Sequence, residues 1–194
     1  MHFKFSPIFV CIFIFVIVLV LIFVPTLGIY SNATFTTNSN FESISLTNNI
    51  LWPVPGYTTI TSYFGYRIAP TTGASTYHSG IDIAAPVGSN LIASFSGEVT
   101  SLGFQGAGGY TITIKSSNYT ASYCHVSPEF KVYIGQKVRK GDVIGKVGPK
   151  NVYGVPNNPY KDNNGNPTNG ATTGPHLHYT LRENSNLVNP LDYF

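Results

Sequence analysis

The chain has 194 residues, of which only 10% are charged, and it contains 19 Gly and 13 Pro. Because typical domains are about one-quarter charged, this composition argues against a coiled coil, a helical bundle or a charge-driven disordered chain, and it favours β-structure with many turns. The formal net charge of +3 is spread over few groups and forms no basic stripe, so we expect no nucleic-acid partner.

The chain opens with a long apolar run. Every residue from Ile8 to Val24 is apolar, with Lys4 before the run and Pro25 after it. As a helix at about 1.5 Å per residue, the run approaches the ~30 Å hydrocarbon core of a bilayer. It exceeds the apolar region of an ordinary signal peptide, and no clear A-x-A site follows. We predict that residues 1–30 form a cytoplasmic N-terminus and a transmembrane signal anchor, with a cleaved signal peptide as the alternative.

Residues 31–50 are predicted to be a polar tether, and residues 51–194 a single domain. Thirteen of the nineteen residues from Ser31 to Asn49 are Ser, Thr or Asn. Short alternating apolar stretches then recur between Gly and Pro, with no convincing helical stripe. We therefore predict an all-β fold, an antiparallel sheet sandwich or partly open barrel. The predicted strands are Leu91–Phe95, Glu98–Phe104, Tyr110–Lys115, Thr120–Val126, Val143–Val147 and His176–Arg182.

A long polar segment interrupts this pattern. Residues 149–174 are rich in Asn, Pro, Gly and Thr, and the segment is longer than most connections between strands. Two interpretations remain open: a disordered surface insertion, or one wall of a substrate groove, because the segment ends directly at a pair of histidines.

Three short motifs carry the residues suited to chemistry. In the predicted strand from His176, alternation places His176 and His178 on one face, about 6–7 Å apart. A third imidazole, His125, lies near the end of the predicted strand Thr120–Val126. His78 and Asp82 lie in a Gly-containing segment, for which the sequence predicts a loop that enters a strand. Two imidazoles and one carboxylate would leave one position of a tetrahedral Zn²⁺ open, as a catalytic zinc requires.

These motifs resemble the M23 family of zinc metallopeptidases, of the lysostaphin and LytM type. The resemblance covers about residues 54–190 and implies a LytM-type fold, similar to a duplicated hybrid motif. The segments that carry it are Phe64-Gly-Tyr-Arg67, His78-Ser-Gly-Ile-Asp82, Ala93-Ser-Phe-Ser-Gly97, Tyr123-Cys-His125-Val-Ser127, Gly135 to Gly145, and Gly174-Pro-His176-Leu-His178-Tyr.

Carried over residue by residue, the resemblance implies that His78, Asp82 and His178 are zinc ligands and that His125 and His176 are catalytic. It implies a peptidoglycan endopeptidase that cuts peptide stems or crosslinks with a metal-activated water. With the predicted anchor, such a domain would lie outside the bacterial cytoplasmic membrane. Some members of the family have lost their zinc ligands, so a catalytically silent scaffold that binds a partner hydrolase or another envelope protein is the alternative.

Overall fold

A computed structural model describes residues 50–194. The predicted membrane anchor and all but the last residue of the predicted tether lie outside the described residues. Within residues 50–194, no helix has both the length and the apolar character needed to cross a membrane.

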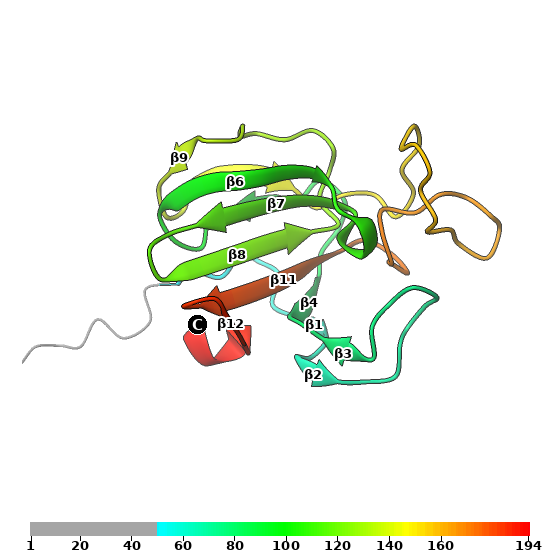
Figure 1. The fold of residues 1–194 in the computed structure, drawn as a ribbon, viewed down its shortest axis with the longest axis horizontal. Coiled ribbons are helices and arrows are strands. Elements are labelled where there is room, and N and C mark those ends of the chain that lie inside the picture. Colours follow the sequence, from blue (N-terminus) through cyan, green and yellow to red (C-terminus); the bar gives the residue numbers. More distant parts are fainter. Residues whose placement is uncertain (1–49) are drawn as a thin grey trace, which may run out of the picture. The chain divides into compact units, whose positions relative to one another are not determined.

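One large antiparallel sheet forms the body of the domain (Figure 1). Its strands alternate apolar and polar residues, and each pairs with an antiparallel neighbour. A further strand, β12 (Asn186–Val188), pairs with the last three residues of β11, Leu181–Glu183. In spatial order the other strands are β1 (Ile60–Ser62), β4 (Ile81–Ala84), β11 (His176–Glu183), β8 (Tyr119–Cys124), β7 (Tyr110–Lys115), β6 (Gly97–Phe104) and β9 (Lys137–Val138).

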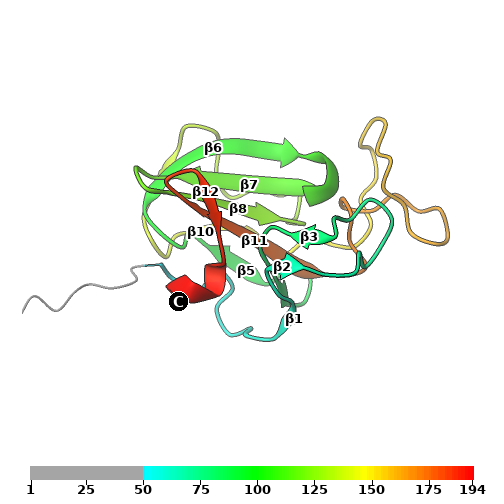
Figure 2. The ribbon, with the colours of Figure 1, turned by 60° about the horizontal axis from the view of Figure 1, so that its bottom comes forward.

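Two small sheets complete the architecture. The pair formed by β5 (Asn90–Ile92) and β10 (Val143–Lys146) lies behind the large sheet in Figure 2. The pair formed by β2 (Gly65–Tyr66) and β3 (Tyr77–His78) precedes β4. The remaining elements of residues 50–194 are two short 3₁₀ turns, η2 (Gly106–Gly108) and η3 (Pro190–Tyr193).

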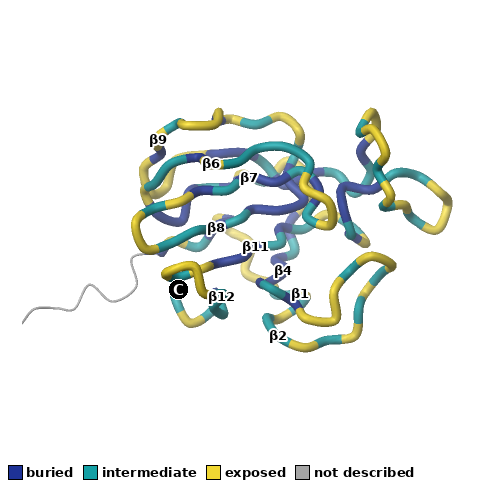
Figure 3. Tube along the Cα trace, viewed as in Figure 1, coloured by how far each residue is buried: buried dark blue, intermediate teal, exposed yellow. Residues whose placement is uncertain are grey.

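The predicted all-β, antiparallel fold class is confirmed for the described residues. All six predicted strands are present, with ends displaced by up to three residues. The sequence did not reveal β1, β2, β3, β9 or β12, because two or three residues are too few to show an alternation. The core lies between the large sheet and the β5–β10 pair, as the buried inner strands in Figure 3 show. Its largest fully buried side chains include Tyr123, Tyr179, Ile81, Ile83, Ile112, Leu177 and Leu181.

The long polar segment is anchored at its base. Residues 149–174 project from one end of the domain as two lobes (Figure 1), while Thr168, Asn169 and Thr172 are buried. The Asn169 side chain accepts a hydrogen bond from the Tyr110 backbone N–H at 2.7 Å and donates one to the Val126 carbonyl at 3.0 Å. These buried hydrogen bonds of a side-chain amide attach the segment to the ends of β7 and β8.

Glycine allows the base of the segment to approach the turn that contains η2. Gly170 has a φ of +77°, and a Cβ there would lie 2.3 Å from the Ala107 carbonyl oxygen. No ordinary side chain fits such a gap, so the two backbones can touch only at glycine. Gly165, in the same segment, has a φ of +79° but open space around it.

We expect Gly170→Ala to destabilise the domain more than Gly165→Ala. Both changes incur the strain of a left-handed alanine, about 1–2 kcal/mol. Only Gly170→Ala also pushes two backbones apart, which should lower the free energy of unfolding by about 1–3 kcal/mol more. Urea unfolding of the two full-length variants measures the difference, and equal losses would show that the close approach contributes nothing.

Candidate functional site

Strand register brings the side chains of His78, Asp82 and His178 together. Asp82 on β4 is directly opposite His178 on β11, and His78 ends the short strand before β4. Gly80 lies between His78 and Asp82 in the sequence, and a Cβ on it would lie 2.1 Å from the Tyr179 carbonyl oxygen. Only glycine therefore allows this segment to lie so close to the β11 backbone. The expectation that the chain enters a strand at Asp82 agrees with the structure.

Three atoms converge at this point. His78 Nε2, Asp82 Oδ1 and His178 Nδ1 lie 2.8–3.1 Å from one another, and the three residues form a group that could hold a metal ion. Atoms about 2.0 Å from a tetrahedral zinc lie about 3.3 Å apart, so modest relaxation would seat an ion here.

Backbone carbonyls fix the protonation of three imidazoles. The Nδ1 atoms of His78, His125 and His176 lie 2.8, 2.6 and 2.9 Å from the carbonyl oxygens of Tyr63, Asn169 and Gly174, respectively. A carbonyl only accepts hydrogen bonds, so each Nδ1 is the protonated nitrogen and each Nε2 keeps its lone pair. His78 therefore directs a lone pair at the carboxylate of Asp82 and at His178. The facing lone pairs of His78 Nε2 and Asp82 Oδ1 repel one another unless a cation, or a proton on His178 Nδ1, lies between them.

His125 enters the site through an unusual backbone conformation. It follows the last residue of β8 and has a φ of +59°, the left-handed region that non-glycine residues seldom occupy. Strand alternation alone would place it on the face opposite Cys124. Its ring centroid instead lies 4.7 Å from that of His176 and 6.2 Å from that of His178. Such strain persists only where the surroundings fix it, and it is common at functional sites.

The surroundings of the site hold its imidazoles and its carboxyl group in different charge states, with His125 neutral and Asp82 ionised. Burial and, to a lesser extent, the neighbouring His176 together lower the pKa of His125 to about 3, so this imidazole is neutral at physiological pH. Burial raises the pKa of the Asp82 carboxyl, but His178 and His78 lower it by more, and the net pKa lies well below its usual range. Burial likewise lowers the pKa of His178, one of the three converging residues. Neutral imidazole beside an ionised carboxylate is the donor set that a divalent cation requires.

Arg67 orients the carboxylate from outside the cluster. Its Nη1 donates a hydrogen bond to Asp82 Oδ2 at 3.1 Å and another to the Ser62 hydroxyl, which leaves Oδ1 facing the two imidazoles. On the other side of the cluster, His178 Nε2 lies 3.1 Å from the Thr180 hydroxyl. Such outer partners fix ligand orientation in metal sites.

The structure brings all five predicted site residues into one cluster. Sequence reasoning missed the outer partners Ser62, Asn169 and Thr180, and it included Arg67 only as part of a family motif. Asn169 acts through its backbone carbonyl, for which a sequence carries no signal. The fixed Nδ1 protonation of three histidines is likewise a property of the folded backbone.

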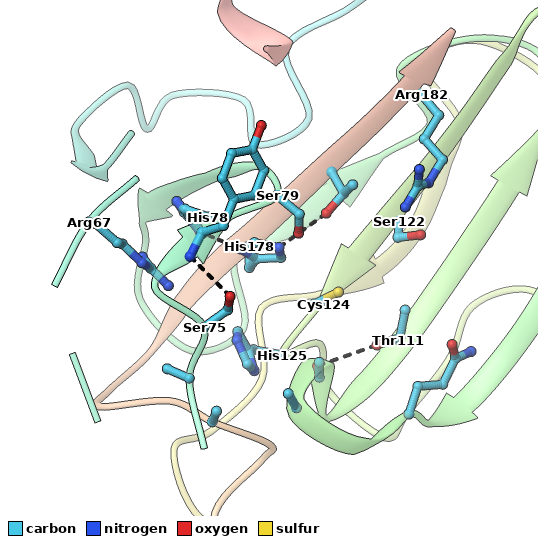
Figure 4. A pocket seen from close by; sticks show the side chains of 17 residues that line it. Arg67, Ser75, His78, Ser79, Thr111, Ser122, Cys124, His125, His178 and Arg182 are labelled. Carbon is cyan, nitrogen blue, oxygen red and sulfur yellow. Dashed lines mark hydrogen bonds between the residues drawn. The ribbon is translucent and has the colours of Figure 1, made fainter. Parts of the chain in front are cut away.

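Two cavities flank the cluster and open a groove across it. One, of about 490 Å³, extends from His78 and His125 over the polar face of β11 and β8 to Arg182 (Figure 4). The other, of about 320 Å³, lies beside Asp82 and His176. Ala171, from the base of the long segment, borders both cavities. Of the two interpretations of residues 149–174, the structure therefore supports a groove wall at the base of the segment.

A His/His/Asp cluster with further imidazoles beside it, set in a groove on an all-β domain, offers the donor set that a catalytic metal site uses. Residues 76–190 match Peptidase family M23, and the chain belongs to this family. The resemblance inferred from the motifs is thereby confirmed.

Relatives and solved structures agree with this membership. The DD-carboxypeptidase/endopeptidase Mpg of Neisseria meningitidis serogroup B is 38% identical over 136 residues, which is 70% of this chain but only 27% of that protein. A zinc-containing peptidase from Vibrio cholerae superposes with a TM-score of 0.56 at 28% identity, covering 73% of this chain and 39% of its own. The lysostaphin catalytic domain of Staphylococcus simulans shares the fold, with a TM-score of 0.54 at 23% identity over 70% of this chain and 90% of that domain.

We expect Arg67→Gln to weaken zinc binding without removing a ligand. Glutamine keeps a donor for Ser62 but loses the charge that holds Asp82, and loss of an outer partner typically costs about 10- to 100-fold in metal affinity. Competition with a chromogenic chelator measures the affinity of the full-length chain. Arg139→Gln, at an exposed position outside the site, serves as the control, and equal affinities in the two variants would remove Arg67 from the site.

Proposed function

We propose that the protein is a zinc-dependent endopeptidase that cleaves peptide stems or crosslinks of bacterial peptidoglycan. The observation that carries the proposal is the convergence of His78 Nε2, Asp82 Oδ1 and His178 Nδ1, with two more imidazoles beside them in an open groove. Family membership and relatives named as peptidoglycan DD-endopeptidases support the reaction class.

The donor set fits zinc better than a harder cation. Two nitrogens and one carboxylate oxygen are ordinary zinc ligands, whereas calcium and magnesium prefer oxygen alone. Three protein ligands leave a position open, as in catalytic rather than structural zinc sites. When bound, zinc would supply Lewis acidity, which polarises a carbonyl group and acidifies water.

The chain's own residues would orient the substrate and move protons. His125 and His176 each hold a proton on Nδ1 and present Nε2 to the groove. In peptide hydrolysis, the oxygen of water bonds to the carbonyl carbon, the C–N bond breaks, and a proton goes to the leaving nitrogen. One Nε2 atom is suited to accept the proton of water, and the other, once protonated, to donate a hydrogen bond to the developing oxyanion.

The alternative function, a catalytically silent scaffold, gains no support from the long segment. The predicted anchor and residues 149–174, which could cover the groove, motivated that hypothesis. Only the base of the segment borders the two cavities, however, and its lobes project away (Figure 1). All five residues that the family resemblance implies for the site are present in this chain. Attachment to the outer face of the cytoplasmic membrane through residues 1–30 remains part of the proposal and rests on the apolar run alone.

We expect the zinc-loaded, full-length chain to release new peptide termini from purified peptidoglycan. A chelator should abolish the release, and added zinc should restore it, because the proposed chemistry requires the ion. Mass spectrometry of the soluble fragments identifies the bond that is cut. Absence of new termini from every wall type tested, with zinc bound, would refute the enzymatic proposal.

His78→Ala and His125→Ala should separate metal binding from proton transfer. The first removes a proposed ligand, so we expect loss of both zinc and activity. The second should keep zinc and lose about 10²- to 10⁴-fold in activity, the usual contribution of a general acid or base. Metal content by atomic emission, measured beside activity, makes the distinction. Full zinc content and full activity in His78→Ala would disprove its assignment as a ligand.

A further inference from the structure

The polar face of the sheet continues the groove beyond the histidine cluster. Strand register sets Thr180 opposite Ser122 and Ser122 opposite Thr113, so hydroxyl groups from three strands form a row. The next row brings Arg182 opposite Thr120. The larger cavity lies over this face and reaches Arg182 at the end away from Arg67 (Figure 4).

Two arginines line this cavity, and among the described residues only one of them is paired with a carboxylate. Arg67 and Arg182 both line it, and no Asp or Glu is among its lining residues. The charge of Arg67 is paired with Asp82 at 3.1 Å. Arg182 has no ion pair among the described residues, and its Nη1 donates only a long hydrogen bond of 3.4 Å to the Ser185 carbonyl. In Figure 4 its guanidinium group is turned back along the cavity toward Ser122.

An unpaired guanidinium group above a floor of hydroxyl groups is suited to bind a carboxylate. Guanidinium binds carboxylates through two parallel N–H donors, and hydroxyl groups supply further donors. Arg182 follows His178 by four residues on β11, which corresponds to about 13 Å along the strand. A peptide extended along the groove from the histidine cluster would therefore bring a group three or four residues from the cleaved bond to Arg182.

From this geometry, and resting on the proposed function, we infer that Arg182 is a specificity-determining residue that binds a free carboxylate of the peptide substrate. The substrate class that follows is a peptide stem whose carboxylate is not amidated. The carboxylate can come from the end of the peptide or from an internal residue with an acidic branch, and both present the same group to Arg182.

The test uses synthetic crosslinked stem peptides that differ in one carboxylate at a time. One pair has a terminal carboxylate or carboxamide, and a second pair has an internal carboxylate or carboxamide. We expect the full-length wild-type chain to favour the acid form of one pair by about tenfold in kcat/KM, the scale of a hydrogen bond to a charged group at an exposed site. The pair that shows the preference identifies the source of the carboxylate.

Arg182→Gln should abolish this preference through KM rather than kcat, Arg182→Lys should keep part of it, and the control Arg139→Gln should keep all of it. Circular dichroism checks that each variant is folded. Equal cleavage of acid and amide forms by the wild type, or an unchanged preference in Arg182→Gln, would overturn the inference.

A binding measurement separates this inference from the proposed function. The same peptides, fluorescently labelled, are titrated with the wild-type chain and with Arg182→Gln in the presence of a chelator, which stops the proposed cleavage so that fluorescence anisotropy reports affinity alone. If the wild type cleaves no peptide, the proposed function fails, and a tenfold preference for the acid peptide that disappears in Arg182→Gln still supports the carboxylate site. Equal affinities of the two proteins for the acid peptide would reject the site.

Discussion

The geometry of the site depends on hydrogen bonds from imidazole Nδ1 atoms to backbone carbonyl groups. His78, His125 and His176 each have such a partner, from Tyr63, Asn169 and Gly174. Each bond decides which nitrogen carries the proton and how the ring is turned, so the Nε2 lone pairs face the groove before any ligand arrives. Without these carbonyls, the same histidines would have two tautomers and several orientations, and the convergence with Asp82 would be lost.

The register of the large sheet fixes the positions of Asp82 and His178 relative to each other. Asp82 and His178 are register partners on neighbouring strands, and their apolar neighbours Ile83, Leu177 and Tyr179 are fully buried on the other face. A slip of one residue would exchange the two faces, placing polar ligands in the core and apolar residues in the groove. Burial of the core side chains therefore enforces the alignment of the site. Stability and chemistry depend on the same alternation in these two strands.

Much of this arrangement could be predicted from the sequence. The alternation in His176–Arg182 indicated which residues share the open face, and the resemblance to the M23 family implied the five residues that meet. The position of His125 could not be predicted, because its left-handed backbone reverses the expected alternation. The contribution of Asn169 was also hidden, since a backbone carbonyl leaves no trace in residue identity. Periodicity reports side-chain direction within strands, whereas turns and long-range backbone contacts require the fold itself.

The anchored base of residues 149–174 divides that segment into two parts with different freedom to vary. The base contacts His125 through a main-chain oxygen and closes on the η2 turn at Gly170, so its backbone path is constrained. The two lobes beyond it contribute no side chain to the cavities beside the histidines. Insertions, deletions or a grafted peptide in the lobes should therefore leave the site intact, which makes this loop a natural position for fusing a second binding module to the domain.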